Sequence, residues 1–207
     1  MGSEMCIRDR LYTDPRGEEE CKALTEKFGA RELAGITGLR AHQMYSIPKM
    51  MWIKKNRPEI YDAAAYIFLM EDYVVYHLTG KRQIDYSLAT RTMAFDIKKL
   101  DWSKEIFEVA GIDVNKMSKT VPTGTDAGAI TAEAAEKTGL APSTHIVSIS
   151  HDQVSAAIGA GAFDSSVAVD GAGTVECVTP IYDSIPDIDA ICLLYTSDAA
   201  DDMQCVD

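Results

Sequence analysis

The chain has 207 residues, with 20 lysines and arginines against 32 aspartates and glutamates, which gives a formal net charge of −12. This length fits one domain or slightly more, and the acidic balance argues against nucleic acid as a main partner, because phosphate contacts need clustered cations. No apolar run approaches the roughly 18 residues of a transmembrane helix, and no secretory segment follows Met1. We therefore expect a soluble, cytoplasmic-type protein without nucleic-acid or membrane partners.

The first part of the chain shows helical periodicity bounded by turn residues. Residues 18–28 place apolar side chains three and four positions apart and stop at Gly29, which predicts an amphipathic helix. A second helix is expected to start at Ser46, which can act as a cap, with Pro48 in its first turn. Pro58 should break this helix.

The middle of the chain predicts short elements. Residues 66–69 are a candidate buried strand, and residues 84–95, which are polar and small, indicate a loop with a short helix. Further helices, each followed by a glycine, are expected at 71–78, 102–110 and 131–138.

The last part alternates strands with one helix. A strand is predicted at 145–150, a helix of small residues at 154–162, and two strands at 166–170 and 175–179 around a tight turn at 171–174. Strands that alternate with helices favour the α/β class.

Asp152 and Gln153 lie where a predicted strand ends and a helix begins. Ligands of open α/β sheets gather outside the carboxyl ends of the strands, and the positive end of a helix dipole favours a carboxylate. Asp152 could therefore accept a proton from a substrate hydroxyl, but an Asp at this place could equally cap the helix. The amide of Gln153 suits polyol recognition, or it is a solvated first-turn residue. Gly173 and Thr174 could meet phosphate through backbone N–H groups and a hydroxyl, or form a plain hairpin turn.

The two ends of the chain are related as DNA. The peptide Met5-Cys6-Ile7-Arg8-Asp9 can be encoded by ATGTGTATAAGAGACA, whose reverse complement translates as Cys-Leu-Leu-Tyr-Thr, the peptide at 192–196. This inverted repeat looks like the transposon end used in sequencing-library adapters. We therefore expect residues 1–10 and 192–207 to be adapter-derived rather than native, and such segments are excluded from fold reasoning.

A series of short motifs follows a recognisable order along the chain. In that order they are Leu11-Tyr12-Thr13-Asp14-Pro15-Arg16, Thr37-Gly38, Pro48-Lys49-Met50-Met51-Trp52, Pro58-Glu59-Ile60, Glu71-Asp72-Tyr73, His77-Leu78-Thr79-Gly80, Asp85-Tyr86-Ser87-Leu88-Ala89-Thr90-Arg91-Thr92, and His151-Asp152-Gln153 with Ala156-Ala157-Ile158-Gly159-Ala160-Gly161. Together they cover most of the native segment, and they resemble the FGGY family of carbohydrate kinases, nearest to its xylulokinase-like and glycerol kinase-like members.

This resemblance implies an actin-like ATPase (ribonuclease H-like) fold, in which ATP and a sugar meet between two domains. Residues 11–164 would form an incomplete N-terminal domain, and residues 165–191 the first strands of the C-terminal domain. The implied activity is ATP-dependent phosphorylation of a sugar or polyol hydroxyl, with ATP and Mg²⁺ as cofactors, and a homodimer of the full-length protein is compatible with it.

The resemblance also assigns roles to residues. Asp152 matches the family's general base, and Gln153 matches a polyol contact. Tyr86 matches a substrate-contacting tyrosine, with an ordinary buried aromatic as the alternative, and Gly173 and Thr174 match a turn near the ATP phosphates. The family's N-terminal phosphate loop and most of its second domain are missing from the chain, so we expect the fragment alone to be inactive.

Three positions depart from the family pattern. His151 replaces a glycine, Val175-Glu176 replaces Ser-Gly or Ser-Ala, and Met70-Glu71 replaces Pro-Lys. These departures keep two alternatives open: an actin-like binding or regulatory module with a decayed kinase site, and an unrelated α/β protein in which Asp152 only caps a helix. Truncation should also leave the apolar faces of 146–149 without partners and make the fragment prone to aggregation.

Overall fold

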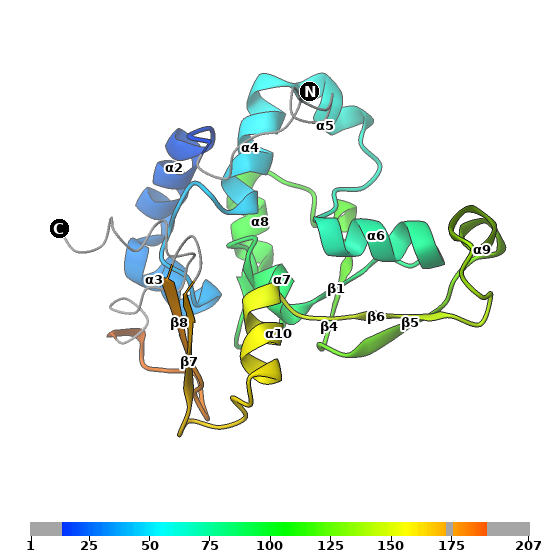
Figure 1. Ribbon diagram of the computed structural model, residues 1–207. Helices are drawn as coiled ribbons and strands as arrows, with labels where there is room; N and C mark the ends of the chain where they lie inside the picture. The colour runs from blue at the N-terminus through cyan, green and yellow to red at the C-terminus, as the bar shows by residue number, and fades with distance from the viewer. Residues whose placement is uncertain (1–13, 173–175, 190–207) are drawn as a thin grey trace, which may run out of the picture.

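The computed structural model describes residues 14–172 and 176–189 (Figure 1). Its helices are α2 (Glu18–Phe28), α3 (Ala30–Thr37), α4 (Ser46–Asn56), α5 (Pro58–Ala63), α6 (Met70–Thr79), α7 (Tyr86–Thr90), α8 (Lys104–Ala110), α9 (Ala132–Thr138) and α10 (Asp152–Gly159), with a 3-10 turn at Val114–Lys116. Its strands are β1 (Gln83–Asp85), β2 (Phe95–Asp96), β3 (Asp101–Trp102), β4 (Lys119–Val121), β5 (Thr125–Ala129), β6 (His145–Ser148), β7 (Ala168–Ala172) and β8 (Glu176–Pro180).

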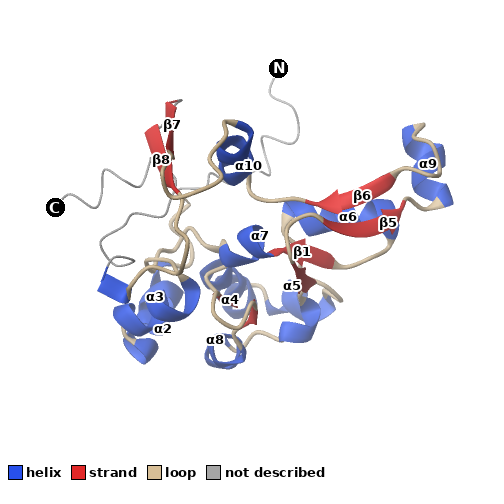
Figure 2. Ribbon diagram, turned by 90° about the horizontal axis from the view of Figure 1, so that it is seen from below, coloured by secondary structure: helices blue, strands red, loops and turns tan. Residues whose placement is uncertain are grey.

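The strands form two-stranded units rather than one broad sheet (Figure 2). β1 and β4 are parallel, with Ile84 opposite Thr120, and the chain between them contains α7 and α8. The pairs β2–β3, β5–β6 and β7–β8 are antiparallel. The parallel pair with intervening helices confirms the α/β class expected from the sequence.

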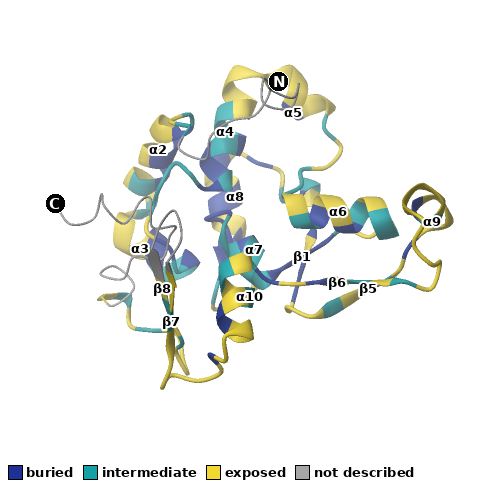
Figure 3. Cartoon of the chain, in the orientation of Figure 1, coloured by how far each residue is buried: buried dark blue, intermediate teal, exposed yellow. Residues whose placement is uncertain are grey.

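The hydrophobic core lies among α2, α3, α4, α7, α8 and the first three strands. Its largest fully buried apolar side chains are Leu24, Leu33, Ile47, Ile84, Met93, Phe95, Ile106 and Phe107. Figure 3 shows that buried residues concentrate around α4, α7 and α8, whereas α9, α10 and the β7–β8 hairpin are largely exposed. The first part of the chain therefore carries most of the core packing.

Side-chain caps fix where several helices begin. The Ser103 hydroxyl accepts a hydrogen bond from the backbone of Ile106 at the start of α8, and the Thr131 hydroxyl accepts one from Ala134 at the start of α9. At the other end of these two helices, Gly111 and Gly139 adopt the left-handed conformation that glycine tolerates best. The predicted glycine stops of these helices are thus confirmed.

Two expectations about the first part of the chain are wrong. Residues 66–69 form no strand, and Tyr66 is 42% exposed. The rings of Tyr66 and Phe68 instead pack against Tyr76 of α6, so contacts with a helix replace pairing with a strand. Ser46 is the first residue of α4 rather than its cap, because Tyr45 occupies the cap position without a capping side-chain hydrogen bond.

Other boundaries shift by a few residues. The helix expected at 102–110 begins at Lys104, because Trp102 pairs with Phe95 in the β2–β3 ladder. The helix expected at 154–162 is α10, which begins two residues earlier, at Asp152. The two last predicted strands are present as β7 and β8, displaced by one or two residues, and the predicted helices at 18–28 and 71–78 are confirmed.

Candidate active site

The start of α10 carries the residue expected to be the general base. Asp152 is the first residue of this helix and follows β6 after a short corner, and its side chain is 89% exposed. One carboxylate oxygen accepts a hydrogen bond from the Gln153 backbone at 2.7 Å and lies 3.1 Å from Nδ1 of His151. His151, not Asp152, occupies the cap position. The interpretation of Asp152 as the helix cap is therefore wrong, and its carboxylate is open to a ligand.

The start of α7 lies directly beside this corner. The backbone N–H of His151 donates a hydrogen bond to Oγ of Ser87 at 2.8 Å, across 64 positions of sequence. Ser87 follows Tyr86, whose half-buried ring packs against Phe95 with 5.4 Å between ring centroids. The structure thus brings the segments of Tyr86, Asp152 and Gln153 together, and the partly buried ring of Tyr86 also packs against the core.

A buried polar cluster at the start of α7, which sequence reasoning missed, supports this helix. The fully buried carboxylate of Asp85 caps the helix by accepting hydrogen bonds from the backbone N–H groups of Ser87 at 3.0 Å and Leu88 at 2.9 Å. It also accepts hydrogen bonds from the hydroxyls of Ser87, at 3.3 Å, and of Thr123. The sequence signal was the Asp-Tyr-Ser triplet, which matches an N-cap followed by a first helical turn.

Glu71 of α6 extends this cluster. Its Oε2 accepts a hydrogen bond from the backbone of Asp85 at 3.1 Å, and its buried Oε1 has no hydrogen-bond partner. Burial is the main cause that raises the pKa of Glu71 to about 7; the nearby Asp85 carboxylate acts in the same direction, whereas the hydrogen bond from the Asp85 N–H acts in the opposite direction. Burial also raises the pKa of Asp72 to about 6, despite a hydrogen bond of 2.6 Å from the Ser118 hydroxyl.

The expected phosphate turn cannot be placed. Gly173 and Thr174 lie outside the described residues. The strands on either side, β7 and β8, are antiparallel, with Gly171 opposite Cys177. Their contact with ATP phosphates stays a prediction.

Comparison with protein-family models identifies the chain. Residues 7–159 match the model of the FGGY family of carbohydrate kinases, N-terminal domain. The chain belongs to this family. The resemblance seen in the motif order is thereby confirmed.

Individual relatives of this FGGY chain are sugar kinases. It is 33% identical over 164 residues to the xylulose kinase of Bacillus subtilis, covering 79% of the chain and 33% of that enzyme. It is 30% identical over 172 residues to the gluconokinase of the same organism, covering 83% of the chain and 34% of that enzyme. The FGGY chain therefore spans about a third of the length of these relatives.

The fold of the FGGY chain agrees with that of solved kinases. The crystal structure of xylulose kinase from Rhodospirillum rubrum superposes with a TM-score of 0.76 at 24% identity, over 81% of this chain and 34% of that one. The expected actin-like ATPase fold is confirmed, and at this identity the likeness speaks for the fold alone.

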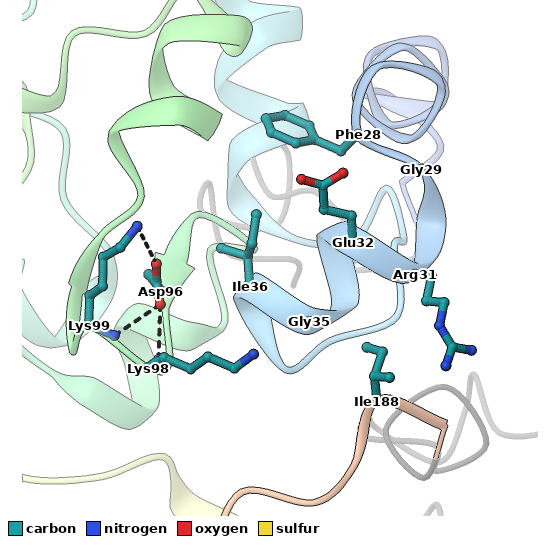
Figure 4. A pocket seen from close by; sticks show the side chains of 10 residues that line it. All are labelled: Phe28, Gly29, Arg31, Glu32, Gly35, Ile36, Asp96, Lys98, Lys99 and Ile188. Carbon is teal, nitrogen blue, oxygen red and sulfur yellow. Dashed lines mark hydrogen bonds and ion pairs between the residues drawn. The ribbon is translucent and has the colours of Figure 1, made fainter.

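The contacts of this FGGY chain with ATP and Mg²⁺ stay predictions. Within residues 14–172 and 176–189, no group of three or more His, Cys, Asp or Glu side chains could hold a metal ion, and the turn expected to contact the ATP phosphates lies outside these residues. A pocket of about 670 Å³ opens between α3 and the β2–β3 turn (Figure 4), where Arg31, Ile36 and Lys98 are among its lining residues. It contains none of the expected site residues. No described helix has the length and apolar character needed to cross a membrane.

Proposed function

We propose that this chain is the N-terminal part of a longer kinase that transfers the γ-phosphoryl group of ATP to a hydroxyl of a sugar or polyol. The observation that carries this proposal is the exposed Asp152 carboxylate at the start of α10, joined through the His151–Ser87 hydrogen bond to the helix that begins with Tyr86. Membership of the family supports the reaction class. We assign residues 11–164 to the N-terminal domain and residues 165–191 to the start of the C-terminal domain.

In the proposed reaction, Asp152 acts as the general base. Its carboxylate accepts the proton of the acceptor hydroxyl while that oxygen forms its bond to phosphorus and the bond to the ADP leaving group breaks. Gln153, in the first turn of the same helix, orients the acceptor through its amide. The half-buried ring of Tyr86 forms one wall of the acceptor site. Its packing against Phe95 holds the ring in place. ATP would supply the phosphoryl group, and Mg²⁺ the charge neutralisation.

The names of the relatives narrow the acceptors to be tested. The relatives compared above act as a xylulose kinase and a gluconokinase, so a five-carbon ketose and a sugar acid are the first acceptors to try. We favour xylulokinase-like activity, because the chain is 33% identical to the xylulose kinase and 30% identical to the gluconokinase. Glycerol serves as a smaller polyol for comparison.

The test is an ADP-release assay on the longer protein, obtained by extending the reading frame of the parent DNA beyond both ends. We expect release of ADP with at least one of xylulose, gluconate and glycerol, and a loss of kcat of about 10²–10⁴-fold in Asp152→Asn. Glu26→Asn, which changes an exposed carboxylate of α2, is the control and should keep full activity. The chain alone should release no ADP.

Two outcomes would contradict the proposal. Full activity of Asp152→Asn would remove Asp152 from the role of base. A longer protein that binds a sugar but releases no ADP with any acceptor would instead support a binding or regulatory module with a decayed kinase site.

A further inference from the structure

We propose that Ser87 is a positioning residue that holds the candidate base, Asp152, at its working place relative to the acceptor hydroxyl. This inference deepens the proposed function and rests on it. The carboxylate contacts that the structure shows for Asp152 come from its own chain neighbours, His151 Nδ1 and the Gln153 backbone. The location of the carboxylate is therefore decided by the location of the corner that carries it.

The hydrogen bond to Ser87 fixes that corner from outside α10. The donor is the backbone N–H of His151, the residue directly before Asp152, and the distance to the Ser87 hydroxyl oxygen is 2.8 Å. A backbone donor cannot rotate away as a side chain can. The bond therefore ties the start of α10 to the start of α7, on which Tyr86 stands.

The orientation of the Ser87 hydroxyl is itself determined. Its oxygen lies 3.3 Å from Oδ1 of Asp85, which as a carboxylate can only accept, so the hydroxyl proton points toward Asp85 and a lone pair faces His151. Asp85 in turn is fully buried and held by two backbone N–H groups of α7 and by Thr123. The hydrogen bonds from Ser87 to Asp85 and from His151 to Ser87 thus hold the candidate base at a fixed position relative to the core.

The Ser87 hydroxyl therefore acts on the rate more than on substrate binding. A displacement of about 1 Å between reacting groups can cost about 10²-fold in rate. In the longer protein we expect Ser87→Ala to lower kcat by about 10–100-fold and to change KM by less than about threefold. Ser87→Thr retains a hydroxyl and should recover most of kcat. Ser103→Ala, which removes the serine that caps α8, should lower the melting temperature without changing kcat.

A double variant separates positioning from general structural damage. If Ser87 acts through Asp152, then Ser87→Ala should cause almost no further loss in the Asp152→Asn background, because the group it positions is already gone. An equal loss of kcat in both backgrounds would overturn the proposal.

Hydrogen exchange provides a readout that does not depend on activity. The His151 amide should exchange faster in Ser87→Ala than in the parent protein and remain protected in Ser87→Thr. Unchanged exchange in Ser87→Ala would refute the positioning role even in an active enzyme. A longer protein that releases no ADP with any acceptor would refute the proposed function, and the positioning role with it, so the two failures are distinguishable.

Discussion

The buried carboxyl of Glu71 makes a sharp prediction about stability and pH. Its pKa is raised from 4.5 to about 7, mainly by burial and secondarily by Asp85. A group that holds its proton more tightly in the folded than in the unfolded state favours folding while it is protonated. This stabilisation is complete below about pH 4.5 and is lost as the pH rises through about 7.

The magnitude follows from the interval between the two pKa values. At about 1.4 kcal/mol per pH unit, ionisation of Glu71 in the folded protein would cost about 3 kcal/mol, and we expect about 2 kcal/mol because the side chain keeps some contact with water. Glu71→Gln imitates the protonated form. It should therefore stabilise the protein by about 2 kcal/mol at pH 8 and by little at pH 5. The amide can still accept the Asp85 N–H, and its NH₂ group replaces the unpartnered oxygen.

The assay is thermal unfolding of the longer protein and its Glu71→Gln variant at pH 5 and pH 8. A gain of about 2 kcal/mol corresponds to about 4–8 °C in the melting temperature of a domain of this size. Asp72, whose pKa of about 6 gives a pH dependence of the same sign, is present in both proteins, so its effect cancels in the difference. Glu26→Gln, at an exposed position of α2, should shift the melting temperature by nearly the same small amount at both pH values. An equal shift for Glu71→Gln at pH 5 and pH 8, or a loss of stability at pH 8, would refute the reasoning.

Two further predictions concern packing. Gly17→Ala should lower the free energy of unfolding of the longer protein by more than Gly29→Ala does. Both glycines have positive φ (95° and 79°), but only a Cβ at Gly17 would crowd the backbone, at 3.0 Å from the carbonyl carbon of Pro48. Equal losses of stability in chemical denaturation would contradict this. Val147→Thr with Ile149→Thr should raise the soluble fraction of the expressed chain, because Val147 in β6 and Ile149 directly after it are apolar residues that are 44% and 58% exposed. A sharp, reversible thermal transition of the unmodified chain would contradict this prediction.

The helices α2, α4 and α6 could be predicted because their signals are local, whereas α3 and α5 were not expected from the sequence. The helix at 18–28 combines three glutamates in its first turn with a glycine directly after its end, and both of its bounds are confirmed. The strands β1 to β4 escaped prediction because each has two or three residues, too few for an alternating pattern to emerge. β5 escaped it because its five residues, Thr-Asp-Ala-Gly-Ala, include no large apolar side chain. Residues 66–69 show the converse error: an aromatic run with strand propensity packs against α6, since contacts between rings decided its conformation.

The candidate site could be predicted only in part, for a related reason. The place of Asp152 after a strand and at a helix start was visible in the sequence, because it depends on neighbours along the chain. The Ser87–His151 hydrogen bond was not, because it joins a side chain to a backbone group 64 positions away, and no periodicity records such a pair. Glu71 stood out in the sequence only as an acid where the family pattern has lysine. The structure gives this departure a physical meaning. The Glu71 carboxyl lies beside Asp85, the carboxylate that caps α7, at a place where a lysine would have offered a positive charge. The replacement of lysine by Glu71 therefore changes the residues that hold α7 in place and not the proposed base, since Asp152 remains exposed at the start of α10.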